Sequence, residues 1–122
     1  MSPGQAGRNK EFGRWGENQA VTFLRRHGFT VLERNWYGRG AELDIVATKA
    51  GDYYFIEVKT RAAGPLATDL AVTPRKRRRL ERAAGQYCLA RDIGDAGKVL
   101  AGLLVIFNRG LKTLKFRLAV YQ

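Results

Sequence analysis

The chain has 122 residues, of which 45% are hydrophobic and 11% aromatic, a composition typical of one folded domain. Its 22 lysine and arginine residues outnumber 11 aspartate and glutamate residues, so the net charge at pH 7 is +11. Such a balance favours partners with dense negative charge, above all nucleic acid or an anionic membrane surface.

Few residue types are left for catalysis. Cys88 is the only cysteine, which excludes an internal disulfide and indicates a reducing compartment. His27 is the only histidine, so the chain cannot build a zinc site from several His and Cys ligands. Ser2 is the only serine and stands in a polar terminus, which argues against a Ser–His–acid triad. Carboxylates and lysines remain as the candidate chemical groups.

The sequence pattern does not predict a targeting signal or a membrane-spanning segment. The first dozen residues are polar, and the longest apolar run, Val99–Phe107, has nine residues, whereas a membrane-spanning helix needs about 20. We therefore expect a soluble, cytoplasmic protein without a membrane partner. We also expect a single domain over residues 1–122, with residues 1–8 disordered.

In chain order, the first predicted element is a helix from about Asn9 to His27, which Gly28 ends. Next come three strands that are rich in β-branched and aromatic residues and joined by short turns, an arrangement that favours a β-meander. These strands are predicted at Phe29–Trp36, Glu42–Thr48 and Tyr53–Thr60.

A second helix is predicted after a loop, with Thr73 as N-cap and Pro74 in the first turn, and it runs to about Arg91. Two further strands, Val99–Phe107 and Lys115–Val120, complete the chain. The first of these is continuously apolar, which indicates a central position in the sheet. The fold class is therefore α/β, with a mixed five-stranded sheet flanked by helices.

Charged residues interrupt two of the apolar strands. Glu57 and Lys59 share one strand face by alternation, and Asp44 lies in the neighbouring strand. Charge in such a setting is costly unless it is paired or binds a metal ion. One interpretation is a solvated surface pair between Glu57 and Lys59. Glu42, two residues before Asp44 on the same strand face, is either an additional ligand or the solvated start of its strand, and the second interpretation is favoured.

The alternative is a site for a divalent cation. Two facing carboxylates, Asp44 and Glu57, are ligands that suit Mg²⁺ or Mn²⁺, and the backbone carbonyl of Val58 is a plausible third ligand. Lys59 would orient the attacking water or neutralise charge on phosphorus. Glu17 is a further candidate for this site, because its helical spacing points it toward the sheet. The alternative is that Glu17 only stabilises the helix dipole as a carboxylate near the helix N-terminus.

The motifs Gly16-Glu17, Glu42-Leu43-Asp44-Ile45-Val46 and Phe55–Arg61 resemble the YraN-like family of small bacterial proteins within the PD-(D/E)XK nuclease superfamily. That family is described as related to archaeal Holliday junction resolvases. The resemblance implies a restriction-endonuclease-like αβββαβ core and a Mg²⁺- or Mn²⁺-dependent endodeoxyribonuclease. It also implies metal-binding roles for Asp44 and Glu57, a catalytic role for Lys59, and a supporting role for Glu17.

Two positions depart from the pattern of the family and superfamily. Ala41 stands where the family more often has glycine before the acidic residue, and Leu43 replaces the superfamily's proline before Asp44. Neither departure removes a ligand.

A basic cluster, residues 75–79 and Arg82, opens the second predicted helix, where positive charge is unfavourable to the helix dipole. It is interpreted as a surface that follows phosphates, or alternatively as a solvated charged face. Trp36 and Tyr37 either stack on unpaired bases or cap the core, and the second interpretation is favoured. The candidate nucleic-acid-binding residues are Arg39, Arg61, Arg75, Lys76, Arg78, Arg79 and Arg82.

The leading hypothesis is thus a metal-dependent DNA endonuclease that acts on branched or structured DNA, with a homodimer expected by analogy to resolvases. One alternative is a catalytically silent module on a nuclease scaffold that binds DNA or structured RNA. Another is a structural protein associated with RNA or ribosomes.

Overall fold

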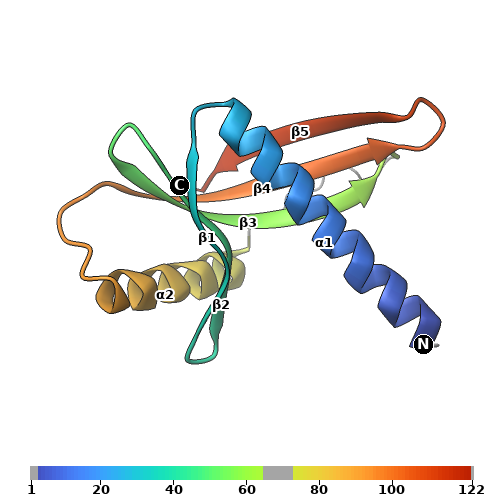
Figure 1. Cartoon of the computed structure of the whole chain (residues 1–122). Helices are drawn as coiled ribbons and strands as arrows, with labels where there is room; N and C mark the ends of the chain where they lie inside the picture. Colours follow the sequence, from blue (N-terminus) through green and yellow to red (C-terminus); the bar gives the residue numbers. More distant parts are fainter. Residues whose placement is uncertain (1–2, 65–72, 122) are drawn as a thin grey trace.

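The structure, a computed structural model, describes residues 3–64 and 73–121 as two helices and five strands (Figure 1). It gives no description of residues 1–2, 65–72 and 122. The elements in chain order are α1 (Pro3–Arg26), β1 (Thr30–Gly38), β2 (Ala41–Lys49), β3 (Asp52–Ala62), α2 (Pro74–Ala90), β4 (Lys98–Asn108) and β5 (Thr113–Val120).

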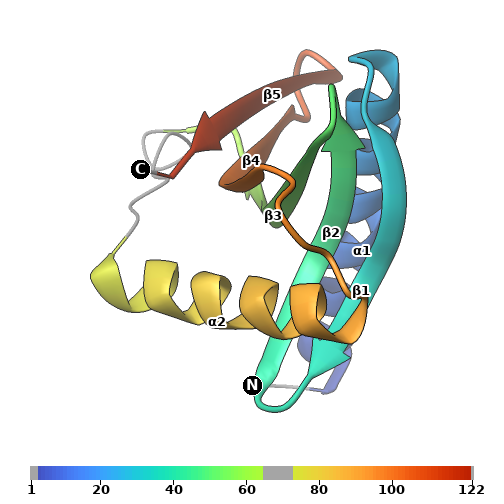
Figure 2. The ribbon, with the colours of Figure 1, turned by 90° about the vertical axis from the view of Figure 1, so that its left-hand side faces the viewer.

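The five strands form one mixed sheet in the order β1-β2-β3-β4-β5. Neighbouring strands are antiparallel except β3 and β4, which run parallel because α2 connects them. The two helices lie on different sides of the sheet, as Figure 2 shows. This is the α/β fold with a mixed five-stranded sheet that the sequence predicts, and it is consistent with a restriction-endonuclease-like core.

Each helix packs on its own hydrophobic cluster. Val21 and Leu24 of α1 lie against Ile45, Ile56 and Leu103 of the sheet. On the other face, α2 buries the residues predicted to line its inward side, which are Leu80, Ala83, Ala84, Tyr87 and Cys88.

The N-terminus of α2 is capped as the sequence predicts. The Thr73 hydroxyl accepts a hydrogen bond of 3.1 Å from the Lys76 backbone N–H, and Pro74 occupies the first turn. The helix ends at Ala90, next to the predicted limit at Arg91.

The start of α1 differs from the prediction at Asn9. The helix begins at Pro3, six residues before the predicted start. Residues 1–2 of the segment expected to be disordered lie outside the described residues. Proline fits the first turn of a helix because its fixed φ suits the helix and its missing N–H would have no intrahelical partner there. Within the described residues, neither helix combines the length and apolar character needed to cross a lipid bilayer.

Candidate functional site

The candidate site lies where β2 separates from β3. The antiparallel pairing of these strands ends at Ile45 and Ile56. Beyond that point the Val58 backbone N–H donates a hydrogen bond of 2.8 Å to Oδ2 of Asp44, so a side chain takes the place of a backbone partner. In an extended strand the N–H and C=O of one residue face the same edge. The Val58 carbonyl therefore points to the same gap as its N–H.

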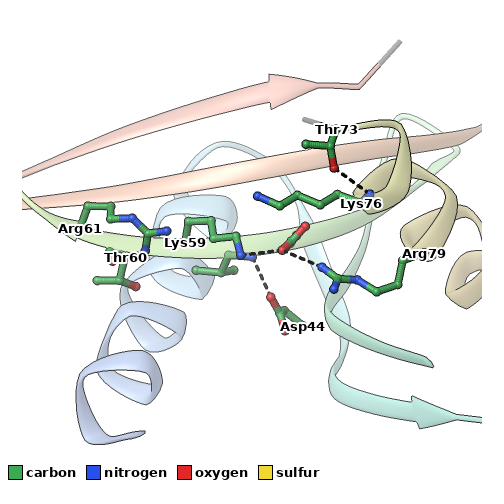
Figure 3. Close-up of polar contacts among 9 residues, drawn as sticks. Asp44, Lys59, Thr60, Arg61, Thr73, Lys76 and Arg79 are labelled. Atoms are coloured by element: carbon green, nitrogen blue, oxygen red, sulfur yellow. Dashed lines mark hydrogen bonds and ion pairs between the residues drawn. The ribbon is translucent and has the colours of Figure 1, made fainter. Parts of the chain in front are cut away.

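Glu57 is the centre of an ion-pair network on the α2 side of the sheet. Lys59 Nζ lies 2.8 Å from Glu57 Oε1, and Arg79 Nη2 lies 3.7 Å from the same oxygen. Figure 3 shows Lys59 extending from β3 and Arg79 from α2 toward this point, with Asp44 beside it. Side-chain exposure is 15% for Glu57, 31% for Lys59 and 59% for Arg79, so the network opens to solvent.

These groups line a pocket of about 670 Å³ between the β1–β2 hairpin, β3 and α2. Its volume falls in the range of small-molecule sites, about 300–1,000 Å³. The lining residues are Tyr37, Gly38, Gly40, Ala41, Glu42, Asp44, Glu57, Val58, Lys59, Arg79 and Leu80. The structure thus brings together three of the four candidate catalytic residues, the Val58 backbone and one residue of the basic cluster.

Glu17 reaches the same region from α1 and is not among the pocket-lining residues. Its Oε1 atom is buried and has no hydrogen-bond partner among the described residues. Gly16 allows this approach, since a Cβ there would meet Thr60 Oγ1 and lie only 2.9 Å from Thr60 Cβ. The glycine therefore lets α1 pack closely against β3 and places Glu17 beside Asp44, consistent with their electrostatic interaction.

Burial and crowded negative charge dominate the electrostatics. Desolvation raises the pKa of Asp44, and the Glu42 and Glu57 carboxylates raise it further, while the Val58 hydrogen bond and Lys59 oppose this. Desolvation and the Asp44 carboxylate likewise raise the pKa of Glu17. Both carboxyl groups thus lie in surroundings that disfavour their ionised forms, a strain that a bound cation would relieve.

The residues present fit a hard divalent cation. Within the described parts of the chain, no three His, Cys, Asp or Glu side chains form a group that could hold a metal ion by themselves. Mg²⁺ does not require one, because it commonly takes one or two carboxylates and keeps several waters. Asp44, Glu57 and the Val58 carbonyl offer an all-oxygen set, and the unpartnered Oε1 of Glu17 can accept a hydrogen bond from such a water.

The remaining basic candidates lie outside the pocket. Arg75, Arg78 and Arg82 are exposed on α2. Lys76 is half-buried beside the N-cap. Arg61 lies further along β3, where it donates to the Thr60 carbonyl (Figure 3).

Arg39 and Arg77 also differ in their surroundings. Arg39 occupies the exposed tip of the β1–β2 hairpin. Arg77, in the basic cluster, forms an ion pair with Glu81 on the same helix, with 2.9 Å between Arg77 Nε and Glu81 Oε1.

Comparison with known proteins shows which family the chain belongs to. The sequence profile described as "Uncharacterised protein family UPF0102" matches residues 16–110. The chain belongs to this family. A UPF0102 protein of Syntrophomonas wolfei is 45% identical over 80 residues, covering 65% of this chain and 70% of the relative. A UPF0102 protein of Geobacter metallireducens is 48% identical over 77 residues, covering 62% of this chain and 63% of the relative.

The relatives differ in length, since the match covers only 42% of the UPF0102 protein of Oleidesulfovibrio alaskensis. The UPF0102 match includes Glu17, Asp44, Glu57 and Lys59. It ends before Tyr121, whose pKa is raised by burial and then by the Glu57 and Asp44 carboxylates.

Sequence reasoning underrates Glu42 and misses Tyr121. Glu42 is exposed, as the favoured interpretation predicts, but it also lines the pocket and raises the pKa of Asp44. Its position two residues before Asp44, on the same predicted strand face, is the available signal. Tyr121 packs over Gly102, the β4 partner of Glu57. No local pattern identifies that contact, because it depends on how β5 pairs with β4.

Proposed function

We propose that this chain is a divalent-metal-dependent endonuclease that hydrolyses phosphodiester bonds in DNA, as a member of the PD-(D/E)XK nuclease superfamily. The observation that carries the proposal is the meeting of Asp44, Glu57 and Lys59 in one pocket, at the point where β2 parts from β3. A module that only binds nucleic acid gains nothing from partly buried carboxylates, because they repel phosphate.

The carboxylates of Asp44 and Glu57 and the carbonyl of Val58 are the groups that would hold Mg²⁺ or Mn²⁺. When bound there, such an ion would supply Lewis-acid chemistry, which would polarise a phosphoryl oxygen and lower the pKa of water. Lys59 places its positive charge 2.8 Å from Glu57, where it would neutralise charge that develops on the phosphate. Glu17 would accept a hydrogen bond from the attacking water and orient it.

Arg79 supplies a second positive charge at the pocket mouth. Its guanidinium is largely exposed and makes only a long contact of 3.7 Å with Glu57, so it can turn to a phosphate oxygen. The exposed arginines of α2 would extend this contact along the DNA backbone. Branched or structured DNA is the substrate that the family resemblance favours, and symmetric cleavage of two strands would require a homodimer.

The test is cleavage of single-stranded, duplex, flap and four-way-junction DNA with Mn²⁺ and with EDTA. Asp44→Asn and Glu57→Gln should each lower the cleavage rate by about 10³-fold or more, as expected for members of a catalytic unit. Glu81→Gln is the matched control, because it removes one carboxylate from an exposed ion pair on α2. Cleavage by the Asp44→Asn/Glu57→Gln double variant at the wild-type rate would refute the proposal.

A further inference from the structure

The tip of the β1–β2 hairpin forms one wall of the pocket. Tyr37, Gly38, Gly40 and Ala41 line it together with Asp44, Glu57 and Lys59. The turn reverses direction at Gly40, whose φ of +59° suits glycine better than any residue with a side chain. The hairpin tip therefore lies within the same pocket as the proposed hydrolytic groups.

A side chain on α2 holds this tip in place. The Arg39 backbone N–H donates to Gln86 Oε1 at 2.7 Å, and Gln86 Nε2 donates to the Arg39 carbonyl at 3.0 Å. Gly38 leaves the space for this interaction, because a Cβ there would meet Gln86 Oε1. Two hydrogen bonds from one side chain to one backbone unit fix both the position and the orientation of the turn.

The two aromatic residues of the hairpin have different surroundings. Trp36 packs against Tyr87 of α2 with ring centroids 5.3 Å apart and an interplanar angle of 84°, so it caps the core as the sequence interpretation favours. Tyr37 is 68% exposed and has no ring partner among the described residues. The favoured interpretation that both residues cap the core is therefore wrong for Tyr37. Trp36 anchors the hairpin, whereas Tyr37 presents an aromatic surface at the pocket mouth.

We propose that Tyr37 is a stacking platform for an unpaired base of DNA whose phosphate is bound by Lys59 and Arg79. This inference rests on the proposed nuclease function and narrows its substrate to DNA with a single-stranded segment at the pocket. Bases in an intact duplex are covered on both faces by their neighbours, whereas an unpaired base can stack on an aromatic side chain. A pocket of about 670 Å³ has room for one nucleotide beside the hairpin.

The experiment uses DNA with a short single-stranded gap that contains the fluorescent base 2-aminopurine, and an otherwise identical full duplex, both in EDTA. Stacking on Tyr37 should quench the fluorescence of the gapped DNA. Tyr37→Ala should abolish this quenching and weaken binding to gapped DNA by about 10-fold, the order expected when one base no longer stacks on an aromatic ring, with duplex binding unchanged. Tyr37→Phe keeps the ring and should behave as wild type.

Two further variants separate stacking from other effects. Leu111→Ala, in the β4–β5 turn, removes a side chain that is also highly exposed and should change neither signal. Gln86→Leu removes both hydrogen bonds to Arg39 and should reduce the quenching although Tyr37 is retained. Wild-type quenching and affinity in Tyr37→Ala would overturn the inference.

Because the measurement is made without metal, it does not depend on hydrolysis. Quenching by Tyr37 together with no cleavage in Mn²⁺ would refute the nuclease function and leave the stacking role intact. Cleavage in Mn²⁺ with no quenching would support the nuclease function and refute the stacking role of Tyr37.

Discussion

The close approach of α1 to β3 at Gly16 gives a quantitative test of how Glu17 is positioned. In Gly16→Ala, the new Cβ would lie 2.9 Å from Thr60 Cβ and 3.0 Å from Thr60 Cγ2, whereas ordinary contacts are 3.4–4 Å. Threonine is branched at Cβ, so rotation of its side chain exchanges one close atom for another. The helix must therefore move away from the sheet, at a cost of about 1–3 kcal/mol.

Gly13→Ala is the matched control, because a Cβ at that position in the same helix meets nothing within 4 Å. Both variants gain up to about 1 kcal/mol from the higher helix propensity of alanine. Only Gly16→Ala has the steric cost, so it should be less stable than Gly13→Ala by about 1–3 kcal/mol.

Urea unfolding of both variants measures this difference directly, with unchanged slopes and midpoints that differ by about 1 M. Gly16→Ala should also cleave DNA more slowly, because the shift of α1 moves Glu17. Equal stabilisation by the two substitutions would refute the close approach of α1 to β3.

Two other predictions concern charge. Burial and then the Asp44 carboxylate raise the pKa of Glu17, so the folded state binds the Glu17 proton more tightly than the unfolded state does. The free energy of unfolding of the wild type therefore falls as the pH rises above the pKa that Glu17 has in the unfolded chain. The free energy of unfolding of Glu17→Gln relative to wild type should thus increase between about pH 4 and about pH 7 in urea titrations with EDTA, and a constant difference would contradict the burial of this carboxylate. Arg82→Ala should lower the slope of log affinity against log salt by about 0.9 for each phosphate that the side chain neutralises in the wild type, with cleavage of bound DNA unchanged. Arg79→Ala should instead slow cleavage of bound DNA. Equal cleavage rates of bound DNA in the Arg79→Ala and Arg82→Ala variants would contradict a role for Arg79 in the pocket.

Much of the fold follows from local patterns in the sequence. The alternating and continuous apolar runs predict all five strands, and Thr73-Pro74 predicts the start of α2. The sequence also predicts Asp44 and Glu57 on adjacent strands, and the structure confirms this placement.

The unpredicted features depend on contacts between distant segments. Gln86 and Arg39 are 47 positions apart, and nothing near either residue indicates their pairing. The register of β1 against β2 shifts between Val31 and Glu33, and such an irregularity changes which side chains face the core. Strand alternation alone therefore could not show that Trp36 packs on the core while Tyr37 is exposed.

Titration of the chain with Mn²⁺ in a calorimeter tests the central claim most directly, because it needs neither a substrate nor a reaction. We predict one binding site in the wild type, loss of binding in Asp44→Asn and in Glu57→Gln, and unchanged binding in Glu81→Gln. Absence of Mn²⁺ binding by the wild type, or equal binding by all four proteins, would contradict a metal site at Asp44 and Glu57.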